Sequence, residues 1–184
     1  MIIGIIGNKR SGKDTVADIL VKEYGFTKYA FADPIKEICK TTFFWDNERI
    51  DGKDKEVCDP QWGLSPREAM QRIGTELFQT ELGEYLPKFK DTNKRLIWVR
   101  RFQYWYENIN DNQNVVVSDV RFLHEYEALK NMNSTLLKID RGLNSADLHD
   151  SEAHVDTLMP DFKINNNKGL GDLAISVHGF MSSI

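Results

Sequence analysis

The stretch Gly7-Asn8-Lys9-Arg10-Ser11-Gly12-Lys13-Asp14-Thr15 decides the fold class. It spells G-x-x-x-x-G-K-D-T, the pattern of a loop whose backbone N–H groups turn inward around a phosphate group. The two glycines permit this turn without a steric clash at Cβ. The ammonium of Lys13 can then reach the β- and γ-phosphates of a nucleotide as a point charge.

The flanks of the loop favour a phosphate site over an ordinary glycine-rich turn. The β-branched run 2–6 predicts a buried strand before the loop. Apolar residues recur at helical spacing after it, up to Gly25. The loop therefore lies at the positive N-terminus of a helix.

The residue after Lys13 departs from the strict motif, which has Ser or Thr there; this chain has Asp14, and Thr15 follows. A carboxylate at this place repels ATP phosphates unless a cation lies between them. We therefore predict that Asp14 contacts Mg²⁺, directly or through one water, and that Thr15 hydrogen-bonds the α- or β-phosphate. The alternative is that Asp14 only caps the loop by accepting backbone N–H bonds.

Strand and helix signals alternate along the rest of the chain, which predicts an α/β fold with a mainly parallel sheet. Helices should cover both faces of this sheet. Polar residues with interrupting Gly and Pro predict a loop over 45–63. The further strands are predicted at 29–31, 114–118, 135–139 and 162–164, and the helices at 34–44, from Ser65 onward, 95–107, 123–130 and 170–180.

Composition excludes several classes of protein. The chain has 184 residues, of which 41% are hydrophobic and 28% charged, a balance too apolar for disorder and too charged for a membrane span. A net charge of −4 disfavours broad binding to nucleic acids. Cys39 and Cys58 predict free thiols in a reducing cytoplasm, and His149 and His154 lack the companions of a zinc site.

Asp119 and Arg121 follow the strand predicted at 114–118. Ligands of open α/β sheets bind outside the carboxyl ends of the strands. Asp119 can therefore hold a magnesium-bound water there, and Arg121 can face the same site. The alternative is a helix-capping aspartate followed by a surface arginine.

The helix that begins at Ser65 carries Arg67, Gln71 and Gly74 on one face, with Thr75 at its edge. A mid-helix glycine costs about 1 kcal/mol unless something packs closely against it. A nucleotide base or sugar would explain it, and so would a close contact with another helix. Trp98, with Phe102 and Trp105 at helical spacing, predicts a core stripe, although Trp98 could also border a base.

In this order, these features resemble the deoxynucleoside monophosphate kinases of bacteriophages and large DNA viruses. Residues 45–63 and 81–94 match poorly. Longer relatives carry an inserted segment before the Ser65 helix, and this segment is minimal here. The matching stretches are the phosphate loop, Ala32–Lys36, Arg67–Glu76, Trp98-Val99, Ser118–Arg121 with Glu125, His149, Glu152 and Ile164–Asn166.

The resemblance implies a P-loop fold in one domain, 1–184, with a helical monophosphate-binding lobe over about 33–95 and a lid-like loop over about 141–160. It implies transfer of the γ-phosphoryl group of ATP to a deoxynucleoside 5′-monophosphate, with Mg²⁺ as cofactor. ATP and the monophosphate are then the partners, without nucleic acid or membrane, in the cytoplasm. A monomer and a homodimer both remain open.

The residue patterns and the resemblance together predict a division of the site residues. Lys13, Lys9 and Arg121 would be catalytic, and Mg²⁺ would lie near Asp14, Thr15 and Asp119. The donor ATP would be held by Arg10, Ser11, Gly12, Lys13, Asp14, Thr15, Arg141 and Asn166. The acceptor would be held by Lys9, Asp33, Lys36, Arg67, Gln71, Gly74, Thr75, Trp98, Asp119, Arg121 and Glu125.

Other classes of P-loop protein stay open. The loop also resembles that of phosphomevalonate kinases, so the acceptor could be another small molecule. A nucleotide-binding switch such as a GTPase is less well supported, since residues 167–170, Asn-Lys-Gly-Leu, lack the aspartate of N-K-x-D. The acidic net charge weakens a role in nucleic-acid processing. The sequence does not rank dGMP, dTMP and a modified dCMP as acceptors.

Overall fold

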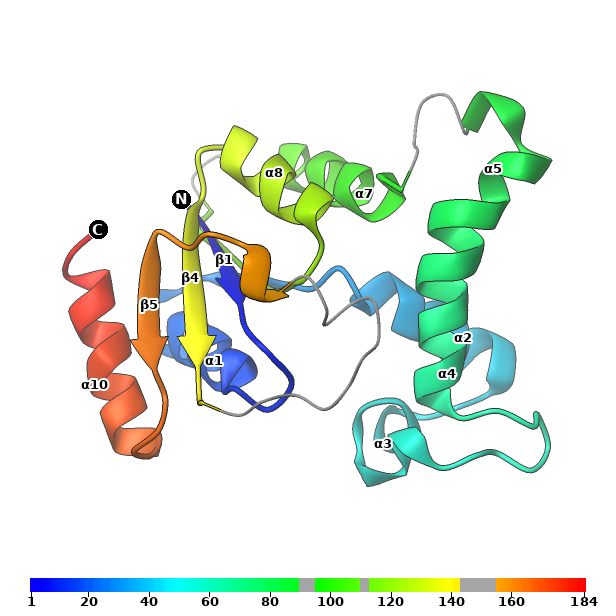
Figure 1. Cartoon of the computed structure of the whole chain (residues 1–184), viewed down its shortest axis with the longest axis horizontal. Coiled ribbons are helices and arrows are strands. Elements are labelled where there is room, and N and C mark those ends of the chain that lie inside the picture. The colour runs from blue at the N-terminus through cyan, green and yellow to red at the C-terminus, as the bar shows by residue number, and fades with distance from the viewer. Residues whose placement is uncertain (90–94, 110–112, 143–154) are drawn as a thin grey trace. The chain divides into compact units, whose positions relative to one another are not determined.

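The computed structural model describes residues 1–89, 95–109, 113–142 and 155–184. Its contacts divide the chain into two compact units, one formed by residues 1–30 and 105–184 and the other by residues 31–104 (Figure 1). The helical lobe predicted over about 33–95 falls within the second unit. Of the lid-like loop predicted over about 141–160, residues 143–154 lie outside the described residues.

The first unit is built on a five-stranded sheet in the order β2-β3-β1-β4-β5. Every pairing in it is parallel, which confirms the predicted α/β class. Because parallel strands end at one edge, the segments that follow them meet there. The strands are β1 (Ile2–Ile6), β2 (Thr27–Tyr29), β3 (Val115–Val120), β4 (Thr135–Asp140) and β5 (Phe162–Asn165).

Helices lie on both faces of the sheet, as predicted. On one face, α1 (Lys13–Tyr24) and α10 (Leu170–Met181) pack their apolar residues against the strands in one core cluster. On the other face lies α8 (Leu123–Asn131). Gly4 makes the close approach on that side possible, since a Cβ there would lie 2.9 Å from Cδ1 of Leu129.

The prediction for the second strand was wrong in position. We expected residues 29–31, whereas β2 covers Thr27–Tyr29 and pairs with Val115–Val117. The apolar residues Ala30 and Phe31 are buried without joining the sheet. The apolar character of these two residues, which predicted a strand, reflects their burial and not strand pairing.

The second unit is helical and has its own core of Cys39, Trp45, Ile50 and Ala69. Its helix α4 begins after Ser65, as predicted, and Ser65 caps it, because its Oγ accepts from the Glu68 N–H at 3.2 Å. The helices are α2 (Asp33–Phe43), α3 (Asn47–Asp51), α4 (Pro66–Gln71), a π-helix (Arg72–Glu81), α5 (Leu82–Tyr85) and α7 (Ile97–Glu107), of which residues 97–104 belong to this unit.

The prediction of a loop over 45–63 was wrong in part. A short helix, α3, and a 3₁₀ turn at Lys53–Glu56 lie within it. The Asp46 carboxylate accepts from the Arg49 N–H at 2.8 Å and starts α3. Trp45 and Ile50 are buried in the core of the unit, and this packing outweighs the polar composition of the segment.

Two predictions from composition can be compared with the structure. Cys39 and Cys58 are both free thiols, the first buried and the second exposed. None of the helices in the described part of the chain combines the length and the apolar character that crossing a bilayer requires.

Candidate active site

The phosphate loop connects β1 to α1 and has the backbone that its glycines predict. Gly12 has φ 103°, in the left-handed region, and α1 begins directly after it. Lys13 is buried, and its Nζ donates to the carbonyl oxygen of Asn8 at 2.8 Å, so the ammonium lies across the loop. The loop thus combines a cation with a helix N-terminus, as a phosphate site requires.

Two residues at the carboxyl edge of the sheet hold the loop from outside. Asn166, directly after β5, donates from Nδ2 to the carbonyl oxygen of Ser11 at 2.8 Å. Arg141, directly after β4, donates from Nη1 to the carbonyl oxygen of Arg10 at 3.3 Å. Both were predicted as donor-site residues, and both contact the loop itself.

Gly7 is required by a close approach at the start of the loop. A Cβ there would lie 2.5 Å from the Ile139 carbonyl oxygen and 2.7 Å from Ser11 Oγ. No real side chain tolerates contacts of this length. The first glycine of the motif therefore lets the loop pass close to the end of β4.

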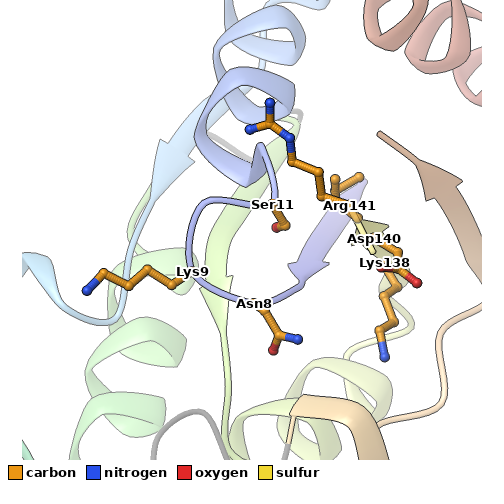
Figure 2. A pocket seen from close by; sticks show the side chains of 7 residues that line it. Asn8, Lys9, Ser11, Lys138, Asp140 and Arg141 are labelled. Carbon is orange, nitrogen blue, oxygen red and sulfur yellow. The ribbon is translucent and has the colours of Figure 1, made fainter. Parts of the chain in front are cut away.

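A small polar pocket opens between the loop and the end of β4 (Figure 2). Among the described residues, Asn8 Oδ1 and Ser11 Oγ are buried in it without a hydrogen-bond partner. Buried polar atoms are nearly always paired, so these two are places where a ligand could bind. The pocket is lined by Asn8, Lys9, Ser11, Lys138, Ile139, Asp140 and Arg141.

Sequence reasoning missed two of these lining residues, Lys138 and Asp140. The available signal was their position, because both lie at the carboxyl end of the strand predicted at 135–139. The strand β4 is the direct neighbour of β1, and Lys138 is in register with Ile6, the residue before the loop. Unless the order of the strands is known, a lysine such as Lys138 within a predicted strand is interpreted as a side chain exposed to solvent.

Asp14 lies in the first turn of α1, with its side chain 83% exposed. The carboxylate oxygen is 3.4 Å from Lys28 Nζ, and the same ammonium is 3.2 Å from Asp18. The structure therefore gives Asp14 an ion pair, and the N-cap residue of α1 is Gly12, which has no side chain to cap the helix. In the described part of the chain, no three metal-ligating side chains of the His, Cys, Asp and Glu types gather.

The residues predicted near Mg²⁺ nevertheless suit its chemistry. Mg²⁺ takes hard oxygen ligands, keeps several waters and needs only one or two protein groups beside substrate phosphates. Thr15 supplies a hydroxyl in the first turn of α1, and Asp119 supplies a carboxylate near the end of β3. These oxygen donors at the carboxyl edge fit a hydrated magnesium ion.

Glu125 is buried under the turn from β3 to α8. Its Oε2 accepts from the backbone N–H groups of Arg121 and Phe122, at 2.9 and 3.0 Å. Burial, with the Asp119 carboxylate as the second cause, raises the pKa of Glu125 to about 8. The resemblance implied that Glu125 lines the acceptor site; in the structure its carboxylate fixes the backbone of Arg121.

The raised pKa of Glu125 predicts how stability depends on pH. Between its ordinary value of 4.5 and about 8, the folded protein retains a proton that the unfolded chain has lost. Stability from this group is therefore present at low pH and lost as pH rises through that window. Glu125→Gln should remove this decline, so its melting temperature should gain on that of the wild type from pH 5 to 8.5. Thermal melts across that range test this.

Glu127→Gln is the matched control, since Glu127 is an exposed residue of the same helix. Its melting temperature should follow the wild type at every pH. A Glu125→Gln curve that stays parallel to the wild type would contradict the assignment.

Three charged residues predicted to bind the acceptor lie in the second unit. Arg67 is in the first turn of α4, and its Nε lies 3.4 Å from the Glu56 carboxylate. Lys36 of α2 is 3.0 Å from Asp51 and 3.6 Å from Asp33. Each of these side chains is thus positioned by an ion pair, and Gln71 and Thr75 follow Arg67, partly buried.

Gly74 is explained by a close helix contact, the alternative left open by the sequence. A Cβ on it would lie 2.5 Å from Cδ1 of Ile35 in α2. Its carbonyl oxygen accepts from Trp98 Nε1 at 2.9 Å, and Trp98 is only 3% exposed. Trp98, Val99 and Phe102 are the buried residues of α7, as a core stripe predicts.

The segment around Gly74 winds as a π-helix over Arg72–Glu81, which the spacing of its residues did not predict. Such segments are rare and often occur at functional sites. His149 and Glu152, which the resemblance included, lie outside the described residues.

The phosphate loop at the carboxyl edge of a parallel sheet defines a P-loop protein. Two solved structures share the fold. One is shikimate kinase from Aquifex aeolicus, with a TM-score of 0.50, 15% identity and 99% of this chain and 96% of that chain covered. The other is the Thermus thermophilus protein TT1252, with a TM-score of 0.51 and 18% identity. The match covers 100% of this chain and 97% of that chain.

The sequence matches the deoxynucleotide monophosphate kinase family over residues 1–59 and 48–177. A protein of Acanthamoeba polyphaga mimivirus, provisionally named a deoxynucleotide monophosphate kinase, is 37% identical over 176 residues, covering 91% of this chain and 89% of its own. The deoxynucleotide monophosphate kinase of Enterobacteria phage T4 is 24% identical over 241 residues, covering 94% and 95%. The chain belongs to the deoxynucleotide monophosphate kinase family.

Proposed function

We propose that the protein transfers the γ-phosphoryl group of ATP to a deoxynucleoside 5′-monophosphate and yields the diphosphate. The observation that carries this proposal is the phosphate loop, with Lys13 lying across it, at the carboxyl edge of the sheet. Membership of the family supports the choice of acceptor. Free cysteines fit a cytoplasmic enzyme.

Such a transfer asks the protein for positioning and charge neutralisation more than for covalent chemistry. Lys13, Lys9 and Arg121 supply positive charge around the migrating group. No general base is required, because the acceptor phosphate is already ionised at neutral pH. Mg²⁺, held by Thr15, Asp119 and Asp14 directly or through water, would neutralise the donor phosphates when bound.

On the donor side, Arg141 and Asn166 stabilise the loop that binds the phosphates. Acceptor binding is assigned to the residues that the resemblance names. Of these, Arg67 is the best suited to an anion, because a guanidinium forks onto phosphate oxygens. Asp33, Lys36, Gln71, Gly74, Thr75 and Trp98 complete that set in the second unit, and Lys9, Asp119, Arg121 and Glu125 complete it in the first.

Arg67→Lys should raise the KM for the monophosphate about tenfold and leave the KM for ATP unchanged. A lysine keeps the charge but loses the forked geometry on phosphate oxygens. Steady-state kinetics with each substrate varied in turn test this. Arg72→Lys is the control, since Arg72 begins the π-helix directly after α4, is more exposed than Arg67, and pairs with Glu68 and Glu76. A change confined to the KM for ATP would refute the assignment of Arg67.

Asp14→Asn should raise the Mg²⁺ concentration for half-maximal rate by several fold, with little effect on metal-free ATP binding. Removal of the charge weakens attraction to the cation but leaves the loop intact. Asp18→Asn is the matched control, because Asp18 pairs with the same Lys28 one turn further along α1. An equal shift in both variants would show that the effect passes through Lys28 and would remove Asp14 from the metal site.

A coupled assay of ADP release tests the proposed function directly. The purified chain, ATP and Mg²⁺ are combined with each deoxy- and ribonucleoside monophosphate in turn. Turnover with deoxynucleoside monophosphates supports the proposal. Turnover only with another small-molecule acceptor, such as phosphomevalonate, would replace it with the alternative that the loop sequence leaves open.

A further inference from the structure

Lys138 is a cation of the phosphate-loop pocket that the mechanism above does not use. It lies in β4, in register with Ile6 of β1, at the carboxyl edge of the sheet. Its side chain is partly buried and lines the pocket together with Asn8 and Ser11. The lining of the pocket therefore includes two lysines, Lys9 from the loop and Lys138 from the strand beside it.

The face of the sheet on which Lys138 lies follows from its neighbours in β4. Leu137 and Ile139 belong to the core cluster with α1 and α10. Leu136 lies on the opposite face, where it crowds Gly4 together with Leu129 of α8. Because side chains alternate along a strand, Lys138 shares the face of Leu136.

Figure 2 shows where this face meets the loop. The side chains of Asn8 and Lys138 are directed to the same side, whereas Lys9 and Arg141 extend elsewhere. The Asn8 amide nitrogen and the Lys138 ammonium are both hydrogen-bond donors on this side of the loop. Two donors placed together form a subsite suited to phosphate oxygens.

Asp140 has a closer partner than Lys138. The close partner of Asp140 is Lys163 in β5, with its Nζ 2.7 Å from Oδ2. The other oxygen of Asp140 accepts from the Gly142 N–H at 2.8 Å. The hydrogen bond from Lys163 is the largest cause that lowers the pKa of Asp140, and Lys138 contributes least. The charge of Asp140 is therefore balanced mainly by Lys163.

We propose that Lys138 is a further catalytic residue, whose ammonium contacts a non-bridging oxygen of the phosphoryl group during transfer, on the side of the loop where Asn8 lies. This inference rests on the proposed function. In that reaction the bond from the γ-phosphorus to the bridging oxygen breaks, and its electron pair stays on ADP. An oxygen of the acceptor phosphate donates the pair for the new bond. The donor and acceptor phosphates are both anions, and a cation in addition to Lys13 reduces the repulsion between them.

The test compares Lys138→Ala, Lys138→Arg and Lys163→Ala in the full chain. We expect Lys138→Ala to lower kcat about tenfold to a hundredfold. Its affinity for ADP, measured by calorimetry, should change less than about twofold, because Lys13 and the loop backbone hold the donor. Lys138→Arg, which keeps a cation, should recover part of the rate. Lys163→Ala should turn over like the wild type.

The outcomes distinguish a direct role of the Lys138 ammonium in catalysis from an indirect effect on the shape of the pocket. Wild-type turnover in Lys138→Ala would overturn the inference. An equal loss in Lys163→Ala would also overturn it, because the effect would then pass through Asp140 and the bend at Gly142. A wild-type chain that transfers no phosphoryl group would overturn the proposed function and this inference together, whereas an active wild type with an active Lys138→Ala variant overturns this inference alone.

Discussion

Lys13→Ala is expected to lower kcat about a thousandfold, the upper end of what the loss of one charge-stabilising group costs an enzyme. The Lys13 ammonium is buried across the phosphate loop, 2.8 Å from the Asn8 carbonyl oxygen. From this position it can move onto a phosphate oxygen with little reorganisation. A methyl group offers no charge to the migrating phosphoryl group, and water does not restore one in a narrow loop. Single-turnover and steady-state rates with ATP and the best monophosphate measure the loss.

The melting temperature separates this effect from unfolding. The variant should remain folded, because the apolar residues of α1, and not Lys13, pack against the core of the first unit. Lys22→Ala is the matched control, an exposed lysine in the last turn of the same helix. Near-wild-type turnover in Lys13→Ala would show that the loop does not bind the transferred phosphate, and the proposed function would fail with it.

The sequence predicted the parts of the fold that depend on local pattern. The run of β-branched residues before Gly7 and the helical spacing after Gly12 predict β1 and α1 at their observed positions. The error at β2 arose from Ala30 and Phe31, which are buried outside the sheet. A segment forms a strand only where it pairs with a neighbouring strand, and the sequence did not show that residues 27–29 pair with β3.

The helix α3 shows the same limit in a polar segment. Its residues carry little helical pattern, but Ile50 is buried in the core of the second unit with Cys39 and Ala69. Trp45, at the start of the segment, stacks on Phe43 and donates from Nε1 to Asp59 Oδ2 at 2.7 Å. Such contacts exist only once the unit has folded, so composition predicted a loop instead.

At the site, sequence reasoning predicted residues that directly follow a strand and missed one that lies within a strand. Asn166, after β5, and Arg141, after β4, donate to carbonyl oxygens of the loop. Lys138 enters the pocket because β4 lies beside β1, an order that one sequence does not reveal. Gly74 drew attention as a base-binding position, although its close contact with Ile35 of α2 already accounts for a small residue there.

Arg121→Lys is expected to lower kcat about a hundredfold while the KM for ATP changes little. Arg121 directly follows β3, and the buried Glu125 carboxylate accepts its backbone N–H at 2.9 Å. The backbone of Arg121, at the carboxyl edge of the sheet, is therefore fixed by a group behind it. A planar guanidinium can bind two oxygens of the migrating phosphoryl group, whereas an ammonium on a flexible stem cannot copy that geometry. A contact that strengthens in the transition state changes kcat more than KM.

Rates with saturating ATP and monophosphate measure this loss, and Arg100→Lys, at an exposed position of α7, is the control. If Arg121 acts through its forked geometry, Arg121→Ala should be only slightly slower than Arg121→Lys, because the lysine keeps the charge but not the contact. If Arg121→Lys retains wild-type kcat and only the KM for ATP rises, Arg121 binds the donor in the ground state. The transition-state role would then have to be assigned to another cation at the same edge of the sheet.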